Sequence, residues 1–456
     1  MNKLNNKISY YFLAAILIVS ACSKEDFLDK KPSTALITPR TLQDCEKLLS
    51  NYDQINASGI LGEVSTDDYY LQTFASWQNQ EISLRNAYIW NQDIFGGSIL
   101  PNDWSNLYQI ILYCNIVLES LGKIDENENP DSWNKTKGAA LFIRAFANFN
   151  LAQIFCPPYD EFSAKQDMGL PIRLSADINE IKQRSNLQDT YDHIIADLLL
   201  AKEIINPGVD YNAPNRPNKP AVFALLAKTY LNMRNYDKAL VYSDSCLNLY
   251  NNLMDYNVDF KSSDRKNAEI LYQSTLGFGE GILSAFFSPL TIVSSELYNL
   301  FDDNDLRKER FFRMENGLPK RNLSYNGTVE GFTGLATDEV YLINAECLVR
   351  KKQIDLALEQ LNKLMENRFI AGTFEPLETG NADLLLEKIL IERRKELCFR
   401  GIRWQDVRRL NKEGAEIVLR RELNGVEYTL EANSIKYVLP IPPAEIQYSG
   451  ILQNER

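Results

Sequence analysis

The sequence contains a single histidine, His193, among its 456 residues. Most Ser-His-Asp and Cys-His mechanisms and most histidine-rich metal sites are therefore excluded, because each depends on imidazole groups. His193 falls on the polar side of an amphipathic helical pattern, which favours a surface position over a role as a general base. The sequence also lacks the GxSxG, HExxH, P-loop and dinucleotide-binding fingerprints. We therefore expect no catalytic residues, although 61 acidic residues leave a glycosidase with paired carboxylates open.

An excess of positive charge and closely spaced cysteines are also absent. The net charge of -12 argues against nucleic acid as a partner. No two cysteines stand in a CxxC pair, so neither a zinc site nor a redox motif is indicated. Apart from Cys22, the cysteines lie mostly in apolar helical patterns, which favours buried free thiols and leaves one or two disulfides as the alternative. These residues are Cys45, Cys114, Cys156, Cys246, Cys347 and Cys398.

Long hydrophobic runs are absent beyond the N-terminus, so no later segment is predicted to span a membrane. The N-terminus has a basic start at Lys3 and Lys7 and a short apolar stretch from residue 10 to residue 19. It ends in Val-Ser-Ala-Cys, with Cys22 last, which resembles a bacterial lipobox. We predict a lipoprotein signal peptide at residues 1–21, acylation of Cys22, and a lipidated tether at residues 22–40. A plain secretory signal is the alternative.

The remainder, residues 41–456, shows helical periodicity without a linker and is predicted to form a single, mainly α domain. Helical hairpins are expected near residues 104–155, 187–249 and 337–368, and a loop-rich insertion with short helices at 255–335. Residues 223–240 and 341–358 repeat one pattern at an offset of 118, with alanines at matching positions. The pattern is similar to a tetratricopeptide repeat, so we predict a tetratricopeptide-like scaffold with loop-rich insertions.

One stretch, Leu384 to Leu410, combines an apolar helical stripe with a densely charged face. Gly401 interrupts it and is predicted to end a helix or to allow close packing. The favoured interpretation is a helix fixed by a salt-bridge network, and the alternative is an anion site made by the arginines. On the first interpretation the structural residues are Arg393, Glu396, Arg403 and Asp406.

These residues also carry a family resemblance. The pattern ER-x-x-EL-x-x-x-G-x-R-x-x-D-x-x-R at residues 392–409 resembles the C-terminal hallmark of the SusD/RagB family, with Arg400 where the family usually has Glu. Residues 27–32, 302–307 and 439–442 are similar to further family motifs, so the resemblance covers nearly the whole mature chain. It implies a SusD-like fold and a surface lipoprotein of the Bacteroidetes outer membrane, facing the exterior. It also implies a SusC-like TonB-dependent transporter as partner.

The resemblance implies a protein that binds oligosaccharides without cleaving them and hands them to that transporter. A surface polysaccharide-degrading enzyme, a binder of peptides rather than glycans, and a pure interaction scaffold remain as alternatives. No cofactor is implied. The run Asp302-Asp303-Asn304-Asp305 favours a capped polar turn, with a structural calcium ion as the alternative, because the late Glu of an EF-hand is missing.

The ligand site is expected where aromatic rings and polar groups occur together in irregular segments. A flat aromatic ring covers the apolar face of a sugar, and polar neighbours bind its hydroxyl groups. Residues 63–91 supply both kinds, and residues 275–332, near Phe278, Phe286 and Tyr325, are the alternative location. Each tryptophan of the first region has a buried core role as its alternative. The predicted ligand-binding residues are Asp67, Tyr70, Trp77, Arg85 and Trp90.

Overall fold

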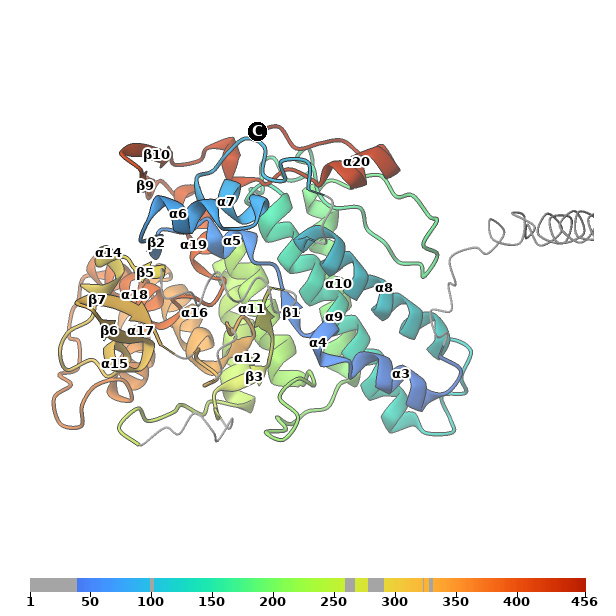
Figure 1. The fold of residues 1–456 in the computed structure, drawn as a ribbon. Helices are drawn as coiled ribbons and strands as arrows, with labels where there is room; N and C mark the ends of the chain where they lie inside the picture. Colours follow the sequence, from blue (N-terminus) through green and yellow to red (C-terminus); the bar gives the residue numbers. More distant parts are fainter. Residues whose placement is uncertain (1–38, 99–101, 259–266, 278–290, 323, 328–330) are drawn as a thin grey trace, which may run out of the picture. The chain divides into compact units, whose positions relative to one another are not determined.

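Helices are the main regular elements of the chain that the computed structural model describes (Figure 1). The described residues are 39–98, 102–258, 267–277, 291–322, 324–327 and 331–456. Their contacts place residues 40–456 in one compact unit. The predicted signal peptide, Cys22 and nearly all of the predicted tether lie outside the described residues. The predicted mainly α fold class is confirmed.

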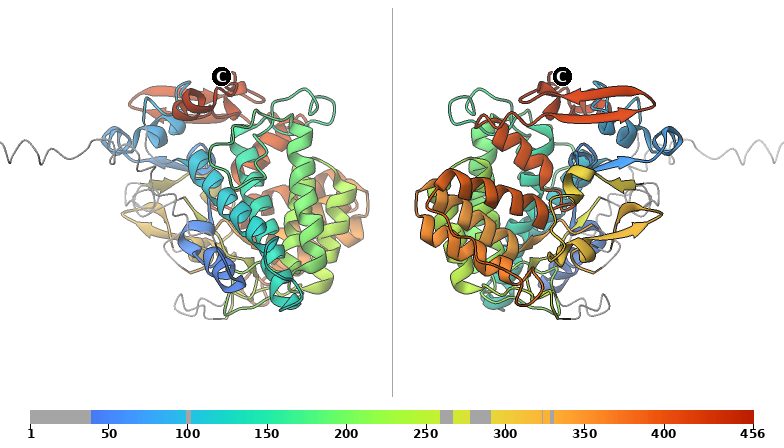
Figure 2. Two further views of the ribbon diagram at one scale, coloured as in Figure 1. Left: turned by 90° about the vertical axis from the view of Figure 1, so that its right-hand side faces the viewer. Right: turned by 90° about the vertical axis from the view of Figure 1, so that its left-hand side faces the viewer.

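The long helices pack against one another in chain order. The first half of the array contains α8 (Asp103–Leu121), α9 (Pro130–Phe155), α10 (Leu187–Ile204), α11 (Lys219–Asn232) and α12 (Tyr236–Leu249). The second half contains α16 (Thr337–Arg350), α17 (Ile354–Glu366) and α18 (Ala382–Glu396), with α16 packed on α12. Figure 2 shows the array from two sides, with α8–α12 in blue to green and α16–α18 in orange. This arrangement is the predicted tetratricopeptide-like scaffold.

Small residues at repeated positions explain how closely these helices approach. Ala227 of α11 and Ala345 of α16 occupy matching positions of the repeat, as do Ala239 and Ala357, and all four are fully buried. A larger side chain at any of them would push the neighbouring helix away, since cores are close-packed. The repeat seen in the sequence therefore marks positions of helix contact.

Asparagine starts most of the long helices. Its side-chain oxygen accepts a hydrogen bond from a backbone N–H of the first turn, which would otherwise lack a partner. Proline in the first turn of α9 and α11 adds a preset backbone angle where no intrahelical hydrogen bond is lost. The capping residues are Asn102, Asn129, Asn186, Asn218, Asn235 and Asn381.

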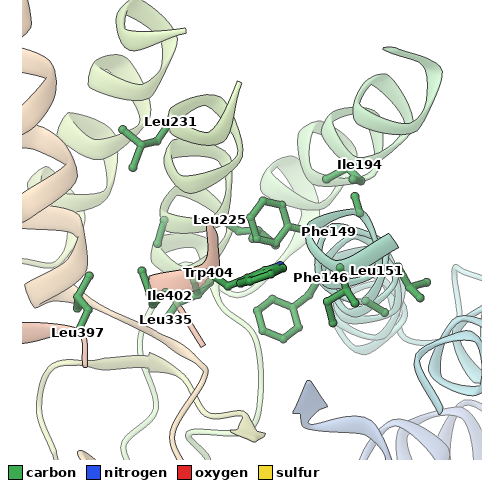
Figure 3. Packing of buried hydrophobic residues seen from close by; sticks show 14 of the residues in the cluster. Phe146, Phe149, Leu151, Ile194, Leu225, Leu231, Leu335, Leu397, Ile402 and Trp404 are labelled. Carbon is green, nitrogen blue, oxygen red and sulfur yellow. The ribbon is translucent and has the colours of Figure 1, made fainter. Parts of the chain in front are cut away.

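The core is closed by the short helix α19 (Arg403–Asn411). Its Trp404 is 2% exposed and lies among Phe146 and Phe149 of α9 and Leu225 of α11 (Figure 3). The Leu384–Leu410 stretch therefore forms two helices, α18 and α19. Gly401 lies between them with φ of +72°, a conformation that favours glycine.

Short strands connect distant parts of the chain. The 255–335 insertion was expected to contain loops and short helices, yet its described part also contains strands. Apolar segments of two or three residues are too short to show a periodicity, and their partners lie far away in the sequence. The distant pairs are β1 (Ala57–Ser58) with β4 (Thr275–Leu276), β2 (Tyr69–Leu71) with β5 (Thr291–Val293), and β3 (Ile270–Tyr272) with β8 (Leu335–Ala336). The insertion also contains a local hairpin of four-residue strands, β6 (Phe312–Glu315) and β7 (Leu318–Arg321).

Short helices fill the segments between the strands and the long helices. They are α3 (Leu42–Leu49), α4 (Tyr52–Ile55), α5 (Leu61–Val64), α6 (Phe74–Gln78), α7 (Ile82–Tyr88), α14 (Ser295–Tyr298) and α15 (Arg307–Phe311). The chain closes with the hairpin β9 (Leu419–Leu423) and β10 (Val426–Leu430), the 3-10 turn η2 (Ile435–Tyr437), and α20 (Pro443–Ser449). Among the described residues, no helix combines the length and the apolar character needed to cross a membrane.

Candidate functional site

The charged residues of the C-terminal motif are buried and paired. The Arg393 guanidinium donates to Asp406 at 2.8 Å and to Glu339 of α16 at 3.3 Å. Arg409 donates to the other oxygen of Asp406 at 2.8 Å and to Glu346 at 2.6 Å. These bonds connect α18, α19 and α16 through groups that burial would otherwise penalise strongly. The arrangement fits the structural role predicted for Arg393 and Asp406.

Glu396 is the centre of a second part of this network. It is fully buried and accepts hydrogen bonds from Arg307 at 2.9 Å and Arg368 at 2.8 Å. Arg368 also reaches Glu269 at 2.7 Å. Together with the pairs of Arg393 and Arg409, these contacts form what we call the arginine network. Each of these arginines already has a carboxylate partner, so the network holds elements together and does not offer an open anion site.

The possible cation sites in this region are already occupied by cationic side chains. Asp305, the last residue of the acidic run, accepts from Arg307 at 2.7 Å and contacts Lys395 at 2.8 Å. Within the described chain, three acidic residues, Glu269, Asp338 and Glu396, come close enough together to hold a metal ion. They pair with Arg368, Arg400 and Arg307 instead. These pairings favour the capped-turn interpretation over a calcium ion.

The network reaches the predicted ligand-binding segment through Arg403 and Arg394. Arg403 donates from Nε and Nη2 to the two oxygens of Asp67, both at 2.9 Å. Arg394 donates to Asp68 at 3.0 Å and to Asp67 at 3.2 Å. Burial raises the pKa of Asp67, but the two guanidinium groups outweigh burial and hold that pKa below its usual range. Asp67 was predicted to bind ligand, and the structure instead commits both of its oxygens to arginines.

Arg421 of β9 holds the same segment from a second side. Its guanidinium lies 3.7 Å from the ring centre of Tyr88 and 4.9 Å from that of Tyr69, and it donates to the Val64 carbonyl at 2.9 Å. The same guanidinium lies 5.4 Å from the ring centre of Trp90. A cation buried against several rings is strongly favourable when it is also hydrogen-bonded. Residues 64–90 are therefore fixed by the C-terminal part of the chain.

Trp90 was predicted to contact ligand, and this part of the prediction is corrected. Its side chain is 1% exposed, and its indole N–H donates to the Ser65 carbonyl at 3.0 Å. The alternation of Tyr88 and Trp90 suggested a packed strand. Tyr88 instead ends α7, and Trp90 lies in the following turn with φ of +52°. Trp90 belongs to the core, which was its alternative assignment.

Within the first predicted region, the aromatic residues that remain accessible lie on β2 and α6. Tyr70 is 40% exposed, because the alternation of a strand buries Tyr69 and turns Tyr70 outward. Phe74 is 37% exposed and stacks on Trp77 with ring centres 5.3 Å apart. The Arg85 guanidinium lies 5.2 Å from the Trp77 ring centre, and the Trp77 N–H donates to the Arg85 carbonyl. We call Tyr70, Phe74, Trp77 and Arg85 the aromatic platform.

The platform contains three of the predicted residues and one that the prediction missed. Phe74 escaped notice because it was treated as one of many aromatics in an irregular segment. The available signal was its spacing of three residues from Trp77, which brings two side chains together on one face of a helix. Recognising Thr73 as a helix cap would have revealed that helix, since its hydroxyl accepts from the Ser76 N–H.

The two regions predicted as alternative sites lie next to each other. β2 and β5 pair in antiparallel register, with Tyr70 opposite Ile292. Of the aromatics named for the second region, Phe278 and Phe286 lie outside the described residues. Tyr325 is 8% exposed and its phenol donates to the buried Glu269, so it does not form part of an accessible site. The first region therefore provides the described aromatic surface.

His193 lies in a different part of the molecule and is partly buried, where a surface position was expected. Its side chain is 13% exposed, and its Nε2 is 3.7 Å from Asp197. Asp197 in turn pairs with Arg144 at 2.7 Å. Burial lowers the pKa of His193. These contacts favour a packing role for the histidine.

Known proteins share this fold and these sequence motifs. A family model described as "Starch-binding associating with outer membrane" matches residues 26–231, and a model described as "SusD family" matches residues 335–455. SusD-like protein P2 of Formosa agariphila is 27% identical over 420 residues, which cover 77% of this chain and 79% of that protein.

Solved structures of the same class superpose over most of the chain. A SusD superfamily protein from Bacteroides thetaiotaomicron has a TM-score of 0.72 at 22% identity, covering 91% of this chain and 100% of that one. A SusD superfamily protein from Bacteroides vulgatus has a TM-score of 0.74 at 22% identity, covering 91% and 99%. Surface glycan-binding protein A from Bacteroides fluxus has a TM-score of 0.71 at 17% identity, covering 91% and 99%.

The fold is thus that of the SusD superfamily. With family models matched in both the N-terminal and the C-terminal part, and with the motif at residues 392–409, the chain belongs to the SusD/RagB family. Membership supports a carbohydrate-binding role in nutrient uptake. The motif's departure at Arg400 is accommodated, because Arg400 forms a buried ion pair with Asp338 at the start of α16.

Proposed function

We propose that this protein is a surface-exposed lipoprotein that captures oligosaccharides and delivers them to a partner TonB-dependent outer-membrane transporter. The observation that carries the proposal is the aromatic platform. Tyr70 and Phe74 present exposed rings, and Phe74 stacks on Trp77, whose ring also contacts the Arg85 guanidinium. The segment that carries them is held by Arg403 and Arg421. A rigid ring with adjacent polar donors suits the apolar face and the hydroxyl groups of a sugar.

Binding measurements on substituted platforms test this proposal. Purified protein is titrated by calorimetry with maltohexaose, laminarihexaose, cellohexaose and xylohexaose, and with the corresponding polysaccharides. The double variant Tyr70→Ala/Phe74→Ala should bind a recognised glycan at least about tenfold more weakly, since an aromatic contact is worth about 0.5–1.5 kcal/mol beyond its buried area. The variant Phe162→Ala is the control, because Phe162 is 88% exposed and outside the platform. Equal affinity in all three proteins would refute the platform as the binding surface.

A polysaccharide-degrading enzyme is less well supported. Glycoside hydrolysis needs a protonated carboxylic acid and a second carboxylate facing the bound sugar. The carboxylates next to Tyr70 in the sequence, Asp67 and Asp68, are instead paired with Arg403 and Arg394. Incubation with the same glycans should therefore release no new reducing ends. Tight binding of mixed oligopeptides in place of glycans would favour the peptide alternative.

The proposal has two further parts, the lipid anchor at Cys22 and the transporter as partner. We propose cleavage before Cys22 and acylation of its thiol, on the basis of the lipobox-like sequence, followed by display on the outer face of the outer membrane. The variant Cys22→Ala should lose fatty-acid labelling and leave the membrane fraction, whereas Cys45→Ala should not. Partnership rests on family membership, and a tagged protein should co-purify the transporter from detergent-solubilised outer membranes.

A further inference from the structure

A groove separate from the aromatic platform lies between α8, the loop at residues 171–182, and α20. Figure 1 labels the two helices. Its volume is about 440 Å³, which is within the range of pockets that hold small ligands. Trp104, Tyr108 and Leu112 of α8 line it, together with Ile178 and Ile181 of the loop and Tyr448 of α20. None of these residues belongs to the platform or to the motif at residues 392–409.

The loop wall of this groove is preformed. Asn115 of α8 is 1% exposed and donates to the carbonyls of Arg173 and Ser175 at 3.0 and 3.1 Å. Tyr108 donates to the Pro171 carbonyl at 3.0 Å. Arg144 donates to Asn115 Oδ1 at 2.8 Å and so fixes the orientation of the amide. A wall held in this way does not have to be ordered when a ligand binds, which removes an entropic cost of binding.

The chemistry of the groove suits a neutral, amphipathic ligand. Its apolar surface includes Tyr448, 62% exposed, and Ile181, 50% exposed. Its charged residues balance, with Arg173 and Lys182 against Glu180 and Glu445. Lys182 and Glu180 also pair with each other at 2.9 Å. The neutral polar groups Ser105, Asn106, Gln109 and Ser449 complete the lining. The exposed Tyr448 ring beside neutral hydrogen-bonding groups matches a sugar better than an ion.

A peptide fits the groove less well. Extended peptides commonly bind by adding a strand to an open sheet edge, which satisfies their backbone groups. The lining residues of this groove come from helices and a loop. The carbonyls of Pro171, Arg173 and Ser175 on that loop already accept hydrogen bonds from α8. Peptide N–H groups would therefore find few free acceptors along the wall.

We propose that the groove between α8, residues 171–182 and α20 is a second binding site for a neutral oligosaccharide. The inference rests on the proposed function, since it assigns the same class of ligand to a second place on the molecule. A glycan longer than one site could then be held at two places. Such two-site contact raises the overall affinity for polymers above the affinity for short pieces.

Stoichiometry provides the test. The full-length protein in detergent is titrated by calorimetry with the four hexasaccharides named above. The wild type should bind two molecules of a recognised hexasaccharide, and Tyr448→Ala should bind one. Tyr448→Phe is the matched variant, because it keeps the ring and should keep both sites. Ile181→Asp, which puts a charge on an exposed position of the groove wall, should also reduce the number to one. The platform variant Tyr70→Ala/Phe74→Ala should retain the site that Tyr448→Ala removes.

The outcomes separate this inference from the proposed function. A single site that disappears in the platform variant and is unchanged in Tyr448→Ala and Ile181→Asp would overturn the second site and leave the proposed function standing. Failure of the wild type to bind any of the hexasaccharides or their polysaccharides would overturn both. Binding of oligopeptides that is lost in Tyr448→Ala would overturn the assignment of the groove to carbohydrate.

Discussion

Arg403 donates two hydrogen bonds of 2.9 Å to Asp67, although the two residues are 336 positions apart in the chain. One belongs to α19 and the other lies just before β2, so this pair ties the end of the helical array to the segment that carries the platform. The Asp67 side chain is 20% exposed and that of Arg403 is 11% exposed. Loss of Arg403 leaves Asp67 with only the longer hydrogen bond from Arg394, at 3.2 Å, and loss of Asp67 removes both hydrogen bonds of the Arg403 guanidinium to this carboxylate.

The first prediction concerns this pair. Replacing Arg403 by Met should lower the free energy of unfolding by up to about 3–5 kcal/mol, because the poorly solvated Asp67 carboxylate would keep only the hydrogen bond from Arg394. Urea denaturation measures the change. Arg420→Met is the matched control, since Arg420 and Glu427 form an exposed pair at 2.8 Å and exposed pairs contribute about 0–1 kcal/mol. Equal effects in the two variants would contradict a structural role for Arg403.

The second prediction concerns Glu63 of α5, which is 2% exposed and accepts a hydrogen bond from the Gly401 N–H at 2.8 Å. Burial, reinforced by the negative charge of Asp68, raises the pKa of Glu63 to about 8. Between the unfolded pKa of about 4.3 and this value, the folded protein keeps a proton that the unfolded chain releases. The contribution of Glu63 to the free energy of unfolding should therefore fall as pH rises, by at most about 1.4 kcal/mol per pH unit.

Glu63→Gln tests this, because glutamine stays neutral at every pH and keeps an oxygen for the Gly401 N–H. The stability of the variant relative to wild type should increase steadily from pH 5 to pH 8 and change little above pH 8, as measured by urea denaturation. Glu387→Gln on the exposed face of α18 should show no such trend. A flat difference for Glu63→Gln would mean that the buried carboxyl is already ionised in the folded protein.

The third prediction concerns the cysteines. Apart from Cys22, all are buried and unpaired in the structure. Burial raises the pKa of Cys114 to about 12 and that of Cys156 to about 11, so the reactive thiolate is scarce. A Cys22→Ser chain lacking the signal peptide should not react with Ellman's reagent while folded. In denaturant without reductant, six thiols per chain should react with the reagent. A smaller number would reveal a disulfide.

Much of the scaffold could be predicted because a helix produces a local periodic pattern of apolar residues in the sequence. Three features depend only on neighbours within a few helical turns. They are the hairpin near residues 104–155, the matched alanines at 227 and 345, and the break at Gly401. The short strands with distant partners could not be predicted in this way. Ile270–Tyr272 and Thr291–Val293 are three residues long, and their partners lie far off in the chain.

The candidate site was predicted only in part, for a related reason. Tyr70, Trp77 and Arg85 were named because of their type and position in an irregular segment. Whether a tryptophan in such a segment faces water depends on what covers it. Trp90 is covered by Arg421, which arrives from the other end of the chain. A single sequence shows the charges of Asp67 and Arg403 and gives no sign that they meet.

The attachment of residues 64–90 to Arg394, Arg403 and Arg421 also sets an order of events during synthesis. The segment that carries the platform leaves the ribosome early, and the arginines that hold it are translated last. Such long-range contacts form slowly, since a large loop must close first. Chains that stop before residue 394 would leave Tyr69, Tyr88 and Trp90 without their cover. Exposed aromatic surface of this kind would mark unfinished molecules for proteolysis.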